Sequence, residues 1–154
     1  MKAKEIQAPN PFQCNSEDVK IFLAGSIEMG KAEEWQKKLI DTLKDEPYSF
    51  LNPRRNDWDS SWEQKKTNPK FFEQVNWELE GLECADIIVM YIDPKTLSPV
   101  TLIEFGLHAK SRKIIMFCPD GFWRKGNVDI VCERYGVKQV DSFEELINTI
   151  KKLS

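Results

Sequence analysis

The stretch from Asp86 to Lys110 constrains the fold of this chain more than any other. It opens with an apolar run rich in β-forming residues that ends on Asp93, and a turn-forming segment follows. Ser98 and the proline after it have the pattern of a helix start, with serine as the N-cap and proline at the first helical position. Buried strands followed at once by helices are typical of open parallel α/β sheets, which bind ligands beyond the carboxyl ends of their strands. Glu104 would lie about one turn inside this helix, near a field that favours an ionised carboxylate, and is therefore a candidate nucleophile.

Composition indicates one domain without a nucleic-acid or membrane partner. At 154 residues, 41% of them hydrophobic, the chain suits one well-packed domain and is short for two. Its net charge of −3 comes from interspersed acidic and basic residues, which disfavours a nucleic-acid platform and a membrane-surface helix. No apolar run reaches the roughly 18 residues of a membrane-spanning helix, and no signal-peptide core begins the chain. We expect a cytoplasmic protein.

The cysteines and the single histidine indicate neither a disulfide nor a metal site. The four cysteines contain no C-x-x-C pair, and at least two lie in apolar surroundings, so free buried thiols are expected. His108 follows Glu104 by one helical turn and could orient that carboxylate, although a structural role is more common for a lone histidine. No metal and no cofactor are expected.

Strands and helices alternate along most of the chain. Residues 1–19 are expected to form an irregular lead-in, and residues 20–154 to form the domain. The predicted strands are 20–24, 48–51, 86–92, 113–118 and 137–140, and the predicted helices are 31–44, 69–84, 99–111, 127–135 and 142–153. This alternation predicts a single-domain, doubly wound parallel α/β sheet of about five strands with helices on both faces.

Two of the predicted helices carry a clear apolar stripe. In the first helix the expected buried residues are Trp35, Leu39 and Leu43. In the second helix they are Phe72, Val75, Leu79 and Leu82.

The turn after the first strand resembles a phosphate-binding loop. Gly25 to Lys31 matches the first seven positions of a P-loop, but the eighth is Ala32, where a hydroxyl would coordinate Mg²⁺. Glu28 would also place a carboxylate inside the phosphate cradle. A degenerate P-loop NTPase is therefore a minor alternative. The milder inference is that Gly25 permits close backbone approach and that the helix start offers N–H donors to a polar ligand group, while a simple tight turn stays possible.

The loop from Asn52 to Gln64 is unusually rich in arginine, aspartate and tryptophan. Such loops on rigid scaffolds often carry function. A flat aromatic ligand could stack on Trp58 or Trp62, with its edge hydrogen-bonded by Asn56, Asp57 or Asp59. Alternatively, the tryptophans bury an interface and the arginines pair with the aspartates.

Glu78 is a candidate second carboxylate. It lies beside the apolar stripe of its helix and could point toward the same sheet edge as Glu104. Two carboxylates there would suit glycosidic chemistry, in which one acts as the nucleophile and the other assists the leaving group or water. The alternative is a solvated glutamate, since Glu73, Glu80 and Glu83 lie on the same helix.

Four segments resemble the nucleoside 2-deoxyribosyltransferase-like proteins: FLAGSIEMGKAEEWQ, NPRRNDWDSSWEQ, FFEQVNWELEGLECADIIVMYID and SPVTLIEFGLHAK. The resemblance covers roughly residues 20 to 118. It implies flavodoxin-like subunits that form homo-oligomers and cleave or transfer at the N-glycosidic bond of a (2-deoxy)nucleoside or nucleotide. The implied partners are this small molecule and a free base. Glu104 would be the nucleophile, forming a glycosyl-enzyme intermediate, and Glu78 the second acid.

The resemblance also implies a set of substrate-binding residues. Gly25, Ser26 and Ile27 would line the sugar side, and Asp57, Trp58 and Trp62 the base side. The set is completed by Asn52, Arg54, Asp93 and Ser98.

The chain departs from the family pattern at several of these positions. The second acid is an aspartate in the family and Glu78 here, and a family aspartate six residues before the nucleophile is replaced by Ser98. A 5′-phosphate would be repelled by Glu28 unless Arg54 or Arg55 reaches it. These departures leave a catalytically silent nucleotide-binding or sensing module as the main alternative.

Overall fold

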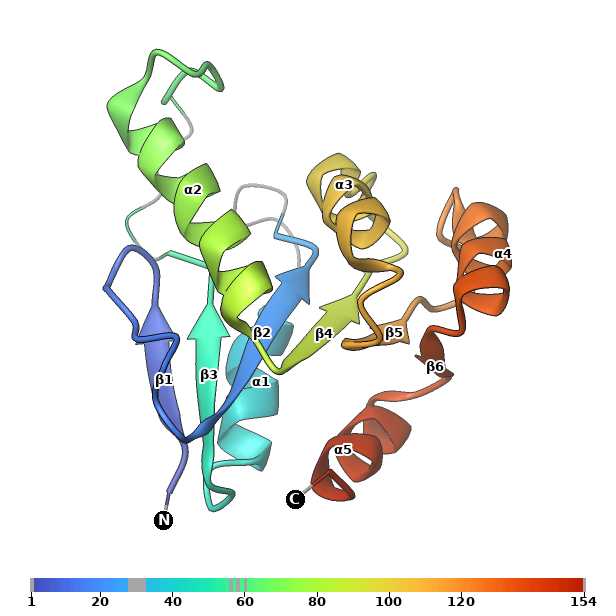
Figure 1. Cartoon of the computed structure of the whole chain (residues 1–154). Coiled ribbons are helices and arrows are strands. Elements are labelled where there is room, and N and C mark those ends of the chain that lie inside the picture. The colour runs from blue at the N-terminus through green and yellow to red at the C-terminus, as the bar shows by residue number, and fades with distance from the viewer. Residues whose placement is uncertain (1, 28–32, 56, 58, 60, 154) are drawn as a thin grey trace.

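Six parallel strands form one sheet in a computed structural model of the chain (Figure 1), which describes residues 2–27, 33–55, 57, 59 and 61–153. The strands are β1 (Lys4–Gln7), β2 (Val19–Gly25), β3 (Tyr48–Asn52), β4 (Ile87–Tyr91), β5 (Ile114–Phe117) and β6 (Lys138–Val140). The helices are α1 (Trp35–Thr42), α2 (Pro69–Cys84), α3 (Pro99–His108), α4 (Lys125–Tyr135) and α5 (Phe143–Lys151).

The strand order places the topological switch point of the sheet between β2 and β4. The order across the sheet is β1-β3-β2-β4-β5-β6. Without β1, the other five strands have the 2-1-3-4-5 order of flavodoxin-like sheets. The chain leaves β2 toward β3 and returns to add β4 on the other side, so the switch point lies where Gly25 is paired with Tyr91. The predicted doubly wound parallel sheet is therefore confirmed.

The prediction of an irregular lead-in over residues 1–19 is wrong at its start. Residues Lys4–Gln7 form the edge strand β1, which pairs in parallel with β3. Lys4 and Glu5 are exposed, so this strand has no apolar alternation that sequence periodicity could detect. With β1 added to the predicted strands, the sheet has six strands instead of about five.

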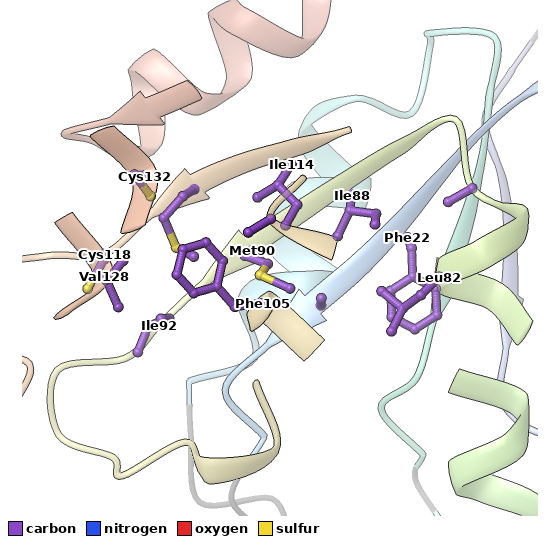
Figure 2. Close-up of a cluster of buried hydrophobic side chains, with 14 of the residues drawn as sticks. Phe22, Leu82, Ile88, Met90, Ile92, Phe105, Ile114, Cys118, Val128 and Cys132 are labelled. Carbon is purple, nitrogen blue, oxygen red and sulfur yellow. The ribbon is translucent and has the colours of Figure 1, made fainter. Parts of the chain in front are cut away.

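Alternate strand residues bury opposite faces of the sheet, as the two-residue period of a strand requires. Phe22, Ile88 and Met90 face α2, α3 and α4, whose Leu82 and Phe105 pack in the same cluster (Figure 2). The opposite strand face is covered by α1 and α5. Both faces of the sheet are thus covered by helices.

The apolar stripe predicted for α1 is confirmed, whereas that predicted for α2 holds only for Leu82, which is buried, and Val75, which is half-buried. Trp35, Leu39 and Leu43 are all buried. On α2, Phe72 is 50% exposed and Leu79 is 36% exposed. The residues of α2 that are buried are Gln74, Trp77, Gly81 and Leu82.

The ends of α2 and α5 form as the sequence predicts. The Asn68 side chain accepts hydrogen bonds from the backbone N–H groups of Lys70 and Phe71, with proline at the first helical position. Ser142 accepts from the N–H of Glu145, and Glu145 accepts in return from the N–H of Asp141.

The expectation of four free thiols is wrong for two of the cysteines. Cys14 and Cys84 form a disulfide, with their Cα atoms 5.3 Å apart. The N-terminal arm packs along α2, where the Trp77 indole donates to the Asn10 carbonyl at 2.7 Å. A contact between residues 70 positions apart has no local sequence signal. Cys118 and Cys132 are free and buried.

Candidate active site

Glu104 lies on the inner side of α3, beside Thr101 and Phe105, and only 5% of its surface is exposed. Its carboxyl group is hydrogen-bonded to that of Glu78, which α2 brings to the same place. Two ionised carboxylates side by side repel each other and have no proton to share. A hydrogen bond between them therefore requires that one carries a proton.

The environment perturbs the pKa of both carboxyl groups. Burial raises the pKa of Glu104 well above its usual value, and the charge of Glu78 raises it further. Burial also raises the pKa of Glu78, but hydrogen bonds from Gln74 and Glu104 act in the opposite direction. The two groups therefore titrate as a pair, with the proton preferring Glu104 and the charge preferring Glu78.

Gln74, which sequence reasoning missed, connects this pair to the loop after β3. Its amide nitrogen donates to Glu78 Oε2 at 3.0 Å and to the Pro53 carbonyl at 2.9 Å. Its amide oxygen accepts from Arg55 Nη1 at 3.4 Å. The sequence signal that could have revealed Gln74 was its spacing from Glu78, because residues four apart on a helix lie on one side of it.

Arg55 is the centre of the loop that follows β3. Its guanidinium group donates to both carboxylate oxygens of Asp57, at 2.9 and 3.0 Å, and lies 5.3 Å from the centre of the Trp62 ring. The Arg55 hydrogen bond holds the pKa of Asp57 below its usual value. The alternative interpretation of this loop, arginine paired with aspartate, therefore describes Arg55 and Asp57.

Gly25 ends β2 with a φ of 146°, a conformation that favours glycine. A Cβ atom there would overlap the Tyr91 carbonyl oxygen and lie 2.8 Å from the Trp35 ring. The close approach expected at Gly25 is thus made by the backbone of β4.

Buried hydroxyl groups link the ends of β2 and β4 to the start of α3. Ser26 Oγ lies 2.6 Å from Ser98 Oγ and 3.1 Å from Thr96 Oγ1, and it accepts from the Asp93 N–H at 2.8 Å. Ser98 precedes α3 as predicted, but its φ of 47° turns the hydroxyl into this cluster, so the predicted side-chain cap is absent. The cluster fixes the start of the helix that carries Glu104.

Asn52 and Arg54 make their contacts on the α1 side of the sheet. The Asn52 amide donates to Glu5 at 2.8 Å and accepts from the Arg54 N–H, and Arg54 Nη1 donates to the Glu33 carbonyl at 2.8 Å. Asn52 and Arg54 line a hollow of about 240 Å³ together with residues of β1 and α1. This hollow does not include either carboxyl group of the Glu78–Glu104 pair.

The remaining predicted site residues have varied settings. Ile27 is half-buried, and the Asp93 carboxylate accepts from the Lys95 N–H in the turn after β4. Trp58 and residues 28–32 of the P-loop match lie outside the described residues. Burial lowers the pKa of His108, and the charge of Lys113 lowers it further, while Glu83 acts in the opposite direction. Among the described residues, no group of three or more His, Cys, Asp or Glu side chains is arranged to hold a metal ion.

Fold and site together define a flavodoxin-like α/β protein with a hydrogen-bonded pair of carboxyl groups, of which Glu104 is buried and Glu78 half-buried. The family model described as nucleoside 2-deoxyribosyltransferase like matches residues 18–122, and the chain belongs to this family. The crystal structure of a conserved protein from Enterococcus faecalis V583 has the same fold, with a TM-score of 0.63 and 16% identity, over 89% of this chain and 99% of that one. No match to a curated protein sequence was found. Within the described residues, no helix combines the length and apolar character needed to cross a membrane.

Proposed function

We propose that this protein cleaves or transfers at the N-glycosidic bond of a (2-deoxy)nucleoside or nucleotide, with Glu104 as the nucleophile and Glu78 as the second acid. The observation that carries the proposal is the hydrogen-bonded pair of carboxyl groups beside the switch point of the sheet. Such a pair supplies an ionised oxygen and a proton within one site, which is what retaining glycosidic chemistry requires.

In the proposed reaction, the Glu104 carboxylate attacks the anomeric carbon while the bond to the base nitrogen breaks. The electron pair of that bond goes to the base, which takes the proton carried by Glu78. A second base or a water molecule then attacks the same carbon, releases Glu104 from the ester, and gives up a proton to the pair. The first acceptor gives transfer and the second gives hydrolysis, without a metal or cofactor.

The surrounding residues have proposed roles in substrate binding. Ser26 and Ile27 follow β2, beside the hydroxyl cluster, and we assign them to the sugar side. Trp62 and Asp57 lie on the loop held by Arg55, and we assign them to the base side. Arg55, through Gln74, joins this loop to Glu78.

A catalytically silent binding module is the second candidate. Its support is that Glu104 is 5% exposed and that the hydroxyl of Ser98, which replaces a family aspartate, is turned toward Ser26. This candidate predicts that a nucleoside or nucleotide binds but that no base is released. The minor NTPase alternative instead predicts phosphate release that depends on Mg²⁺.

The test is incubation of the purified protein with deoxynucleosides and their monophosphates, in EDTA, with and without a free base. Base release or exchange that is lost in Glu104→Gln supports the proposal; we expect a loss of at least about 1,000-fold with the fold retained. Glu80→Gln, an exposed glutamate of α2, is the matched control and should retain activity. Turnover that survives in Glu104→Gln contradicts the assignment of the nucleophile.

Two further properties belong to this proposal. We propose a homo-oligomer, because apolar side chains are exposed along α2 and α3. We also propose a cytoplasmic location, where nucleosides and free bases would be available.

A further inference from the structure

We propose that Gln74 is a positioning residue that keeps the charge of the carboxyl pair on Glu78, so that the shared proton rests on Glu104 until substrate enters. The catalytic consequence of this inference rests on the proposed function. Its physical content concerns the protein without substrate and is tested separately.

The hydrogen bonds of Gln74 determine which way its amide group faces. Arg55 has only donors to offer, so it must face the amide oxygen of Gln74. The Pro53 carbonyl accepts only, and therefore faces the amide nitrogen. The flipped amide would set its oxygen against that carbonyl and against Glu78 while turning its N–H groups toward the guanidinium. Both N–H groups are thus committed, one of them to Glu78 Oε2.

The position of Gln74 is fixed at both ends. Its side chain is 5% exposed, so water has little access to the amide. Arg55, on one side of it, is held by the two oxygens of Asp57 and lies 3.7 Å from the Glu73 carboxylate. A donor that is already in place, in a site with little water, stabilises a charge without reorganisation.

The donor favours the charged form of one partner only. A hydrogen bond donated to a carboxylate stabilises its ionised form. Glu78 receives such a bond from Gln74, whereas the carboxyl group of Glu104 is hydrogen-bonded, among the described residues, to Glu78 itself. The proton therefore rests on Glu104, the group that must lose it before it can act as the nucleophile.

The other charged groups around the pair do not reverse this preference. Arg55 is neutralised by Asp57 and Glu73, so it acts on Glu78 through the Gln74 amide. Asp93, beyond β4, has its carboxylate turned to the Lys95 N–H.

Substrate entry then requires one internal proton transfer. The O–H bond of Glu104 breaks and a new O–H bond forms on Glu78, which leaves the negative charge on Glu104. Since Gln74 already donates to Glu78 Oε2, the proton goes to Oε1. Glu104 is now the nucleophile and Glu78 the acid, with no external acid or base consumed.

The test is a pH titration of the side-chain carboxyl signals of ¹³C-labelled glutamates by NMR, assigned with Glu78→Gln and Glu104→Gln. In the wild-type protein, Glu78 should ionise before Glu104 as the pH rises. In Gln74→Met, which removes both N–H groups at similar size, the first ionisation of the pair should move to higher pH. Gln74→Asn keeps an amide group that is too short to reach Glu78, and it should move this first ionisation in the same direction. This second variant tests the inference if Gln74→Met does not fold.

The matched control is Gln36→Met, which removes a buried glutamine of α1 whose amide has no hydrogen-bond partner among the described residues. It should leave the titration of the pair unchanged. A titration that is also unchanged in both Gln74 variants, or a wild-type protein in which Glu104 ionises first, overturns the inference.

Turnover provides a second readout where the wild-type protein is active. The acid side of the pH profile of kcat should move to higher pH in Gln74→Met, while KM stays within about threefold of wild type. A purely structural role would lower activity without moving the profile and would count against the inference. Absence of any wild-type turnover would instead contradict the proposed function, and the NMR titration would still decide where the proton rests.

Discussion

Glu104 is an acidic side chain in a place where water cannot solvate its charge. Burial and the neighbouring charge of Glu78 both act against its ionisation. An apolar or amide side chain would avoid that cost, so the carboxyl group lowers stability, as is common for residues kept for function. The same residue can therefore be tested in two ways, by turnover and by stability.

We expect Glu104→Gln to be more stable than the wild-type protein at alkaline pH. The pKa of Glu104 is raised in the folded state. The contribution of this group to the free energy of unfolding is therefore fully present below its unfolded pKa, about 4.5, and is lost as pH rises through the folded pKa. Glutamine has no such loss. Near pH 8 the variant should gain about 1 kcal/mol in the free energy of unfolding, and the gain should shrink near pH 4.

Urea unfolding at the two pH values measures this difference. Glu80→Gln, an exposed glutamate of α2, should change the stability little at either pH. A Glu104→Gln protein that is less stable than wild type at both pH values would show that ionising the Glu104 carboxyl group does not lower the stability of the folded protein.

At this scale, the sequence predicted the two carboxyl residues but not their state. Glu104 and Glu78 could be chosen from strand and helix patterns and from a family resemblance. The side chain that orients Glu78 could not, because Gln74 looks like an ordinary polar helix residue until Arg55 and Pro53 are placed around it. Ser98 was predicted correctly as the residue before α3, but its hydroxyl is turned away from the helix by a left-handed backbone.

Among the elements, α2 has the largest influence on the site because it carries both Gln74 and Glu78. Its close contact with the sheet is made at Gly81, where a Cβ atom would lie 2.6 Å from the Phe22 ring. This contact turns Gln74 toward the loop after β3 and leaves Phe72 on the surface. The predicted apolar stripe was wrong at Phe72 and Leu79 because a glycine sets the face of closest approach, and an apolar count gives glycine no weight.

Gly81→Ala should therefore destabilise the protein, although alanine is normally the better helix residue. Phe22 is fully buried and cannot move aside, so we expect a loss of about 1–3 kcal/mol from overpacking. If α2 shifts to relieve the clash, kcat should also fall, since Glu78 moves with it. Thermal unfolding and turnover assays measure both effects.

Gly126→Ala on α4 is the matched control, because nothing lies within 4 Å of the position that the new methyl group would take. It should leave the stability unchanged or raise it by up to about 0.5 kcal/mol. Equal effects of the two substitutions would mean that the contact of α2 with Phe22 does not fix its position.

Element boundaries followed the sequence closely where periodicity and caps agreed. Asn68 with Pro69, and Ser142 with Glu145, start α2 and α5 as predicted. The edge strand β1 and the Cys14–Cys84 disulfide were missed for one reason. Both depend on how the N-terminal arm returns to the domain, which is a long-range property without a local pattern.

On the scale of the whole molecule, the face that carries the site is also the more apolar on its outside. Helices α2 and α3 cover the same face of the sheet. Their outer sides expose Phe72 and Leu79 on α2, and Val100, Ile103 and Leu107 on α3. The α3 residues recur at the spacing of one helix face, which makes a continuous stripe. A stripe of this kind on the helix that carries Glu104 fits contact with a second copy of the chain.

We expect the wild-type protein to sediment as a homo-oligomer and Ile103→Asp to sediment as the 18.0 kDa monomer. Ile103 is 62% exposed, so the aspartate costs the isolated subunit little but places a charge in the centre of the proposed interface. Ile130→Asp is the matched control, because Ile130 is 69% exposed on α4, away from the stripe, and should leave the assembly intact. Sedimentation velocity at micromolar concentration distinguishes these outcomes. A wild-type protein that is monomeric there would refute the interface, and would mean that the site formed by Glu78, Glu104 and Gln74 is complete within one chain.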